Sequence, residues 1–184
     1  MGFPDSFATA RLRAERLTPE HFSIVFDMHR DPEQMAMLGG IRDEQQTADY
    51  LDRNLQHWAD HGFGVWILRD AQQGRVAGRA LLRHLLLEGE DEVEVGYSFH
   101  PAFWGRGLAT EIATACVRLG YDALGLRTIV ALTMPDNLRS QRVLTKAGLA
   151  YERDVSHDEL THMLFRSRIP DTPGADPLRG AGPV

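Results

Sequence analysis

The sequence predicts one mixed α/β (α+β) domain in which helices flank a central β-sheet. The order strand, glycine loop, helix and strand over residues 93–133 implies one parallel, right-handed crossover. Two further extended segments, at residues 64–69 and 75–87, are separated by a short turn and should therefore pair antiparallel. The 184 residues are 43% apolar and 25% charged, which is typical of a single globular domain with a sizeable core.

The N-terminal third predicts one strand followed by two helices. Residues 9–13 alternate as expected for a first strand. Thr18 is a good N-cap and Pro19 suits the first helical position, so a helix should begin there and end before the Asp-Pro pair at 31–32. From Asp43 onward apolar residues recur every three or four positions, which predicts a second, amphipathic helix.

Strands and helices then follow one another to the end of the predicted domain. We expect strands at 64–69, 75–87, 93–99, 127–133, 151–155 and 161–168, and helices starting at 108 and spanning 137–147. The domain should cover residues 1–168. The segment 169–184 is rich in proline and glycine and poor in apolar residues, so we expect a flexible tail.

Bulk properties exclude several classes of function. A net charge of −6 argues against general nucleic-acid binding and mildly favours a cationic ligand. The absence of a long apolar run argues against a membrane span, and the N-terminal residues lack the features of a secretory signal, so we expect a cytoplasmic protein. Cys116 stands alone, which excludes an internal disulfide, and His157 and His162 lack the spacing of a zinc helix, so we expect no metal.

The segment Trp104-Gly105-Arg106-Gly107 is the most informative part of the chain. It joins a predicted strand to a predicted helix, and its glycines let the backbone approach a ligand closely. Backbone N–H groups and the positive end of the helix dipole would then favour a phosphate or pyrophosphate. An ordinary helix start is the alternative. The sequence lacks the glycine patterns of a Walker A loop, a dinucleotide fold and a serine-hydrolase elbow.

Several motifs in order resemble those of the GNAT N-acetyltransferase superfamily. Trp104 to Ala109 resembles its cofactor motif, with the aromatic first residue that is usual in the branch resembling RimJ/RimL ribosomal-protein N-terminal acetyltransferases. The same branch typically carries segments like those of this chain at residues 9–12, 62–64, 94–97, 137–140 and 146–148. The resemblance covers about residues 8–168.

This resemblance implies a mixed, splayed sheet that binds acetyl-CoA in the V between two parallel strands. The backbone at Ser98 and Phe99 would pair with the pantetheine, the glycine loop would hold the pyrophosphate, and Asn137 and Ser140 would lie near the cofactor and its sulfur. The implied cofactor-binding residues are Ser98, Phe99, Trp104, Gly105, Arg106, Gly107, Leu108, Ala109, Thr110, Asn137 and Ser140.

Acetyl transfer to an amine requires a neutral amine, although an alkyl ammonium has a pKa of about 10. We expect Glu94 to be the base, acting directly or through water, with a structural role as the alternative. Strand alternation places Glu92 on the same face, and His84 lies on the neighbouring strand, so both are weaker candidates. Ser140 stands where many relatives have a tyrosine near the sulfur, and we expect a catalytic contact there. Asn137 also suits the N-cap of its helix.

The predicted activity is N-acetylation by direct attack in a ternary complex with acetyl-CoA. The acceptor is a peptide N-terminus or a small-molecule amine, and the motifs do not choose between them. Two alternatives remain at this stage, namely a non-catalytic acyl-CoA-binding module and a transferase for another acyl-CoA. No sequence pattern specifies the oligomeric state, and a homodimer is a working hypothesis.

Overall fold

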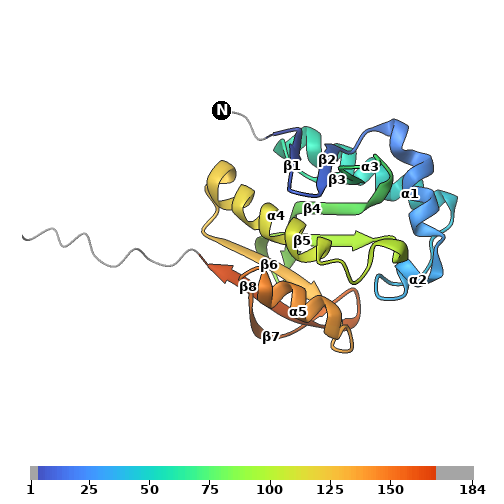
Figure 1. Cartoon of the computed structure of the whole chain (residues 1–184). Coiled ribbons are helices and arrows are strands. Elements are labelled where there is room, and N and C mark those ends of the chain that lie inside the picture. Colours follow the sequence, from blue (N-terminus) through green and yellow to red (C-terminus); the bar gives the residue numbers. More distant parts are fainter. Residues whose placement is uncertain (1–3, 169–184) are drawn as a thin grey trace, which may run out of the picture.

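The computed structural model describes residues 4–168, and the predicted tail at 169–184 lies outside this range. Eight strands form one mixed sheet in the order β1-β2-β3-β4-β5-β6-β8-β7 (Figure 1). The strands are β1 (Ser6–Ala8), β2 (Leu12–Arg16), β3 (Val65–Asp70), β4 (Val76–Leu87), β5 (Glu90–Phe99), β6 (Thr128–Thr133), β7 (Ala150–His157) and β8 (Leu160–Arg168). The α/β fold class is therefore confirmed, with helices on both faces of a mixed sheet.

The helices lie in two groups on opposite faces of the sheet. They are α1 (Phe22–His29), α2 (Pro32–Met35), α3 (Glu44–His61), α4 (Leu108–Leu124) and α5 (Leu138–Lys146), with short 3-10 turns at Pro19–His21 and Pro101–Phe103. The α4 and α5 helices cover the face that is nearest the viewer in Figure 1. No helix among residues 4–168 is long and apolar enough to cross a membrane.

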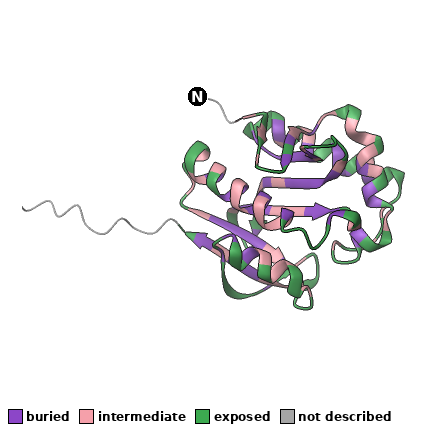
Figure 2. Cartoon of the chain, viewed as in Figure 1, coloured by how far each residue is buried: buried purple, intermediate pink, exposed green. Residues whose placement is uncertain are grey.

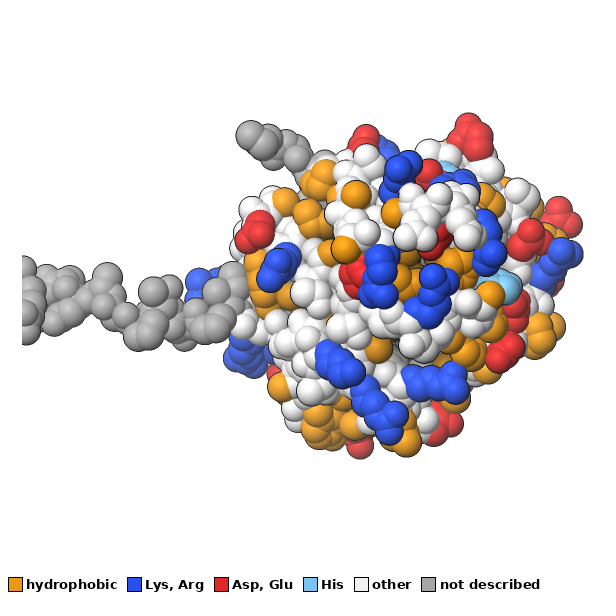
Figure 3. All heavy atoms as spheres, viewed as in Figure 1, with side chains coloured by type: hydrophobic (Ala, Val, Ile, Leu, Met, Phe, Trp, Pro, Cys, Tyr) orange, Lys and Arg blue, Asp and Glu red, His pale blue; other side chains and the backbone are white. Residues whose placement is uncertain are grey.

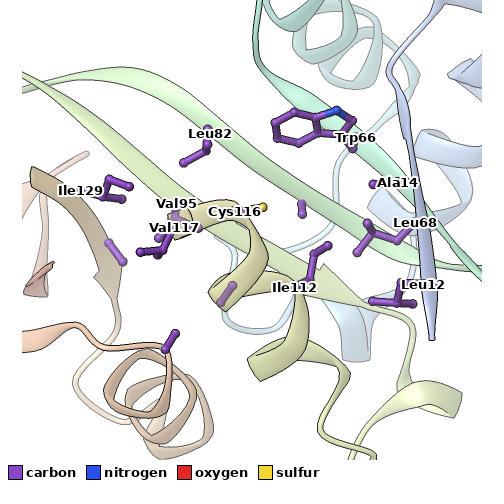
Figure 4. Close-up of a cluster of buried hydrophobic side chains, with 14 of the residues drawn as sticks. Leu12, Ala14, Trp66, Leu68, Leu82, Val95, Ile112, Cys116, Val117 and Ile129 are labelled. Atoms are coloured by element: carbon purple, nitrogen blue, oxygen red, sulfur yellow. The ribbon is translucent and has the colours of Figure 1, made fainter. Parts of the chain in front are cut away.

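The main core lies between α4 and the middle of the sheet. Ile112, Cys116 and Val117 of α4 pack against Leu82 of β4 and Val95 of β5 (Figure 4). Burial raises the pKa of the Cys116 thiol to about 12, so this residue is an inert core side chain, as its place on an apolar helix face predicts. Figure 2 shows the same pattern over residues 4–168, where the central strands are mostly buried, the edge strand β7 is mostly exposed, and the helices are exposed on their outer sides.

A second apolar cluster fixes α1 and α3 to the other face of β3. It includes Val25 and Met28 from α1, Leu51 from α3, and Val65 and Ile67 from β3. The α3 helix begins where the sequence predicts, because the Asp43 side chain accepts a hydrogen bond from the Gln46 N–H.

The sheet opens between its only parallel neighbours, β5 and β6. Their paired register contains the single residue pair Glu94 and Val130, whereas β6 pairs with β8 along its whole length. Beyond Glu94, β5 continues to Phe99 with β4 as its hydrogen-bonded neighbour. The carboxyl-terminal half of β5 thus has a free edge, and parallel strands that diverge at this end commonly frame a ligand site.

Two sequence-based boundaries were wrong. The strand expected at 9–13 begins only at Leu12, and residues 9–11 form a turn between β1 and β2. There the Thr9 N–H donates to the Leu12 carbonyl (2.9 Å) and the Leu12 N–H donates to the Thr9 hydroxyl (3.1 Å). The β5 strand begins at Glu90 rather than at 93, since Glu88 and Gly89 alone make the tight hairpin connection, both with positive φ.

Candidate active site

The glycine loop presents a row of unused backbone donors. Gly105 and Gly107 have φ of 72° and 74°, a left-handed conformation that side chains disfavour. The N–H groups of residues 105–110 find no acceptor within the described part of the chain, and the first of them belong to an exposed loop. Since α4 begins at Leu108, its positive dipole end points at the same place. The loop can therefore hold an anion such as a pyrophosphate.

Arg11 holds the loop in shape. Its Nη1 donates to the Arg106 carbonyl (2.7 Å), and its Nε donates to Glu111 on the first turn of α4 (2.6 Å). Burial disfavours the Glu111 charge, but hydrogen bonds from Thr9 and Arg11 outweigh it and lower the pKa of this carboxyl. Residues 9–12 were expected only as a motif, and this supporting role was not predicted, because the partners lie about 100 positions apart.

Trp104 ties the loop to the end of β5. Its indole Nε1 donates to the Phe99 carbonyl (2.7 Å), and the Arg139 guanidinium lies 5.2 Å from the centre of its ring. The loop, β5 and α5 therefore form one connected rim. Lys and Arg side chains gather on the face of the molecule that carries this rim (Figure 3), and such a surface favours an anionic ligand.

Asn137 and Ser140 lie together at the start of α5. The Asn137 Oδ1 accepts from the Ser140 N–H (3.1 Å), which is the N-cap that the sequence predicts. The Ser140 hydroxyl lies 3.1 Å from the hydroxyl of Tyr97 on β5. Burial raises the pKa of Tyr97 to about 12, so this phenol stays protonated at neutral pH. Tyr97 was not predicted as a partner of Ser140, although it is the last residue of the motif at 94–97.

Glu94 lies on the opposite face of β5 from Tyr97, as strand alternation requires. It is 8% exposed, and its Oε1 accepts from the Nε of Arg83 on β4 (2.5 Å). Burial disfavours the Arg83 charge, but the Glu94 carboxylate more than offsets this and raises the pKa of the guanidinium. The second oxygen of Glu94 makes no hydrogen bond to residues 4–168 and is not sealed from solvent. It is free to contact a substrate or a water.

The two weaker base candidates are occupied elsewhere. Both oxygens of Glu92 accept from Arg166 of β8, at 2.7 and 3.0 Å. The suggestion that His84 shares the site was wrong, because it pairs with Val93 and so faces away from Glu94, and its ring lies 4.3 Å from that of His61. A neighbouring strand brings a residue into the same site only when both point to the same face.

The predicted pantetheine segment is held from two sides. Ser98 is buried, and its hydroxyl accepts from the Gln34 side chain of α2 (3.0 Å). Phe99 is a core residue whose carbonyl is taken by Trp104. Both side chains are thus buried in the protein, so this segment can offer a ligand only backbone groups on the free edge of β5.

The opening between β5 and β6 lies where these groups come together. Tyr97 and Ser140 are on the α4/α5 face and Glu94 is on the other, so an intact sheet would separate them. Because β5 and β6 diverge just after Glu94, an elongated ligand that lies along the free edge of β5 can be contacted by side chains from both faces of the sheet. The glycine loop lies beyond the carboxyl end of the same strand.

Comparison with known proteins agrees with this arrangement. The family model described as an acetyltransferase (GNAT) domain matches residues 11–150. The chain therefore belongs to the GNAT acetyltransferase family, whose members use acetyl-CoA as co-substrate.

Similar curated proteins cover most of the chain. The uncharacterised protein YkkB of Bacillus subtilis is 28% identical over 84% of this chain and 91% of its own length. The FsC-acetyl coenzyme A-N(2)-transacetylase of Aspergillus fumigatus is 30% identical over 78% of this chain and 64% of its own length.

Solved structures share the fold. An acetyltransferase from Agrobacterium tumefaciens superposes with a TM-score of 0.79 at 24% identity, over 92% of this chain and 96% of its own. An aminoglycoside acetyltransferase in complex with coenzyme A has a TM-score of 0.69 at 18% identity, over 85% of this chain and 93% of its own. A ribosomal-protein-S5-alanine acetyltransferase from Vibrio fischeri has a TM-score of 0.72 at 17% identity, over 90% of this chain and 97% of its own.

Proposed function

We propose that this protein is an N-acetyltransferase that moves the acetyl group of acetyl-CoA to a primary amine by direct attack in a ternary complex. One observation carries the proposal. The unused N–H groups of residues 105–110 lie beyond the end of β5, while the free oxygen of Glu94 lies beside the same strand at the opening of the sheet. This arrangement fits a long donor along the β5 edge and an amine entering from the Glu94 face.

Different residues of the chain carry out different steps of the proposed reaction. The loop N–H groups hold the pyrophosphate of acetyl-CoA, whose thioester is the acyl source, and Arg11 keeps the loop in place. Glu94 takes a proton from the acceptor ammonium, directly or through water, so that a neutral amine attacks. Ser140 donates a hydrogen bond toward the leaving sulfur, and the protonated Tyr97 hydroxyl donates to the Ser140 oxygen behind it, so that the sulfur leaves as a hydrogen-bonded thiolate and takes its proton from solvent.

Two classes of acceptor amine fit this proposal. The transacetylase from Aspergillus fumigatus bears a name that describes an N(2) acceptor, and two of the solved structures are named for a ribosomal-protein alanine and for aminoglycosides. The motifs at residues 94–97 and 137–140 favour the RimJ/RimL-like branch. Both a peptide N-terminus and a small-molecule amine therefore belong in the first test.

That test combines a binding and a turnover measurement. We expect acetyl-CoA alone to raise the melting temperature of the protein, and we expect thiol release when a suitable amine is added. Stabilisation without release from any amine would favour a non-catalytic acyl-CoA-binding module. No stabilisation at saturating acetyl-CoA would contradict the proposal.

Two matched glycine variants separate binding from folding. Gly107 caps the start of α4 and Gly125 caps its end, and both have left-handed φ. A Cβ would meet open space at Gly125 and only an ordinary contact with the Arg11 side chain (3.6 Å) at Gly107. Gly107→Leu and Gly125→Leu should therefore pay a similar backbone strain, of about 1–3 kcal/mol. Only Gly107→Leu should lose the stabilisation by acetyl-CoA, and equal responses would remove the loop from the proposed site.

A further inference from the structure

A group of arginines lies on the same face of the sheet as Glu94. Arg79 of β4 is 7% exposed, and Arg42 precedes α3 and is half-buried. Their guanidinium carbons lie 4.6 and 5.5 Å from the ring centre of Tyr50. Within residues 4–168 neither guanidinium forms an ion pair with a carboxylate, unlike the neighbouring Arg83, which pairs with Glu94. Burying such charges without a counter-charge is unfavourable.

The partner that Arg79 does have is a neutral histidine. The Thr47 hydroxyl donates to the Asp43 carbonyl (2.8 Å), so it accepts from Nδ1 of His29 (3.0 Å). Nε2 of His29 is then the unprotonated nitrogen, and it accepts from Nη1 of Arg79 (2.7 Å). Burial, reinforced by Arg79 and Arg42, lowers the pKa of His29 to about 3. The histidine thus orients Arg79 without neutralising it.

The cluster also contains donors that lack acceptors. Nε and Nη2 of Arg79 make no hydrogen bond to the described residues and are not sealed from solvent. The Tyr50 hydroxyl is buried without a hydrogen-bond partner. Buried polar groups in native proteins are nearly always paired, so an unpaired set of donors around uncompensated positive charge calls for an anionic acceptor.

We propose that the acceptor amine also carries a carboxylate, and that Arg79, Arg42 and the Tyr50 hydroxyl bind it. This inference rests on the proposed acetyl transfer. The arginine fork matches the two oxygens of a carboxylate. Because the Tyr50 hydroxyl is buried and the Arg42 guanidinium lies over the Tyr50 ring, contact between this hydroxyl and the carboxylate requires a side-chain movement at this place.

The sheet register places this carboxylate site and Glu94 on one face of the β4–β5 pair. Arg79 pairs with Ser98 and Arg83 pairs with Glu94, so four residues, or roughly 14 Å of strand, separate the two. Between them, the Leu81 side chain packs over Gly96 on the same face. An acceptor that lies over this apolar stretch would place its ammonium at Glu94 and its carboxylate toward Arg79.

The position of Arg79 assigns the carboxylate to the acceptor rather than to the acyl donor. The donor is expected at the opening between β5 and β6, whereas Arg79 is on β4, on the other side of β5. A dicarboxylic acyl-CoA is the competing source of the same chemical group, and the experiment distinguishes the two.

The experiment compares matched acceptors of increasing length. Amino carboxylates from glycine to 6-aminohexanoate are each assayed with acetyl-CoA against the n-alkylamine of equal chain length. We expect kcat/KM to favour the amino carboxylate by at least about tenfold at the best length. Arg42→Gln and Tyr50→Phe should bring the ratio of kcat/KM between amino carboxylate and alkylamine toward one, because they raise the KM for the amino carboxylate. Arg30→Gln, at the exposed residue that follows α1, should leave it unchanged. Because each acceptor is compared between variants, differences in amine basicity cancel.

Tyr50→Phe makes the test independent of folding, since it removes a hydroxyl that the folded protein leaves unpaired and should not lower the melting temperature. A second readout, stabilisation of the cofactor-free protein by 6-aminohexanoate, should be lost in Arg42→Gln. Two results would overturn the proposal: a ratio near one in the wild type, or a preference for succinyl-CoA with alkylamines that Arg42→Gln abolishes. Absence of thiol release with every amine would instead contradict the proposed acetyl transfer, and the binding readout would still decide whether the cluster takes a carboxylate.

Discussion

Glu92 and Glu94 are the same residue type, two positions apart on one face of β5, and each is paired with an arginine. Glu92 gives both oxygens to Arg166, which lies on β8, on the far side of the parallel pair. Glu94 gives one oxygen to Arg83 of the adjacent β4 and keeps the other free. The first pair ties the two halves of the sheet together just before they diverge, and the second lies at the mouth of the opening.

The difference shows that the position of the arginine, rather than the carboxylate itself, separates a structural residue from a candidate base. A bidentate pair across the parallel strands engages both oxygens of the carboxylate, so neither is left to act as a base without breaking the pair. A single contact from a neighbouring strand orients the carboxylate and leaves an oxygen for the substrate. We expect the two residues to respond to the same substitution in opposite ways.

Glu94→Gln tests the catalytic half of the comparison and should give the largest effect. It removes the proton acceptor while it keeps the shape of the side chain, so kcat/KM should fall about 10²- to 10⁴-fold at neutral pH. Activity should partly recover at high pH, where more of the acceptor amine is neutral in solution. The pH–rate profile with acetyl-CoA and a good amine measures this, and an unchanged profile would remove Glu94 as the base.

Glu92→Gln tests the structural half and should mainly lower stability. Its side chain and that of Arg166 are 15% and 12% exposed, and the substitution leaves the arginine with Glu152 as its remaining acid. We expect the free energy of unfolding to fall by about 2 kcal/mol. Urea denaturation of both variants provides the comparison, because Glu94→Gln, which breaks one contact to a half-exposed arginine, should cost less. The opposite ranking of stabilities would contradict the assigned roles.

Most of the fold was predictable from the sequence because the signals are local. The N-cap at Asp43, the two glycines at 105 and 107 and the apolar period of α4 lie within single elements, and the structure has each of these elements where it was expected. Glu94 was singled out by a motif, and the structure leaves it available for catalysis. Its role there stays a prediction.

The parts that the sequence did not reveal depend on pairing between distant segments. Nothing local indicates that Arg166 engages Glu92, that Arg11 reaches the glycine loop, or that Tyr97 meets Ser140, since 43 to 95 positions separate these partners. The net charge was also a poor guide. It favours a cationic ligand, whereas the face around Glu94 is locally basic, because Glu88 and Glu92 are paired with Arg153 and Arg166.

Tyr97→Phe sharpens the comparison by testing the other face of β5. The variant keeps the ring that packs in the core and removes the hydroxyl that contacts Ser140. We expect kcat to fall about tenfold with little change in KM for acetyl-CoA, because a single hydrogen bond of about 1–1.5 kcal/mol is lost near the leaving group. Ser140→Ala should have an effect of the same kind, and the double variant should be no worse than the more impaired single variant. Additive losses would show that the two hydroxyls act separately.

Glu152→Gln tests whether Glu152 contributes to the ionic contact between Glu92 and Arg166. Its effect on stability should be the smallest of the four. Hydrogen bonding to Arg166 lowers the pKa of the Glu152 carboxyl below its usual value near 4.5. A carboxyl with a lowered pKa in the folded protein stabilises it above the pKa of the unfolded chain, and this stabilisation disappears as the pH falls through the lower folded value. The free-energy difference between wild type and Glu152→Gln, measured by urea denaturation from pH 6 to pH 3, should therefore shrink toward zero on the acid side. Because Glu152 is partly exposed, the difference at neutral pH should stay below about 1 kcal/mol. A difference that does not depend on pH would mean that Glu152 packs beside Arg166 without contributing its charge, and that Glu92 alone makes the ionic contact that closes the sheet.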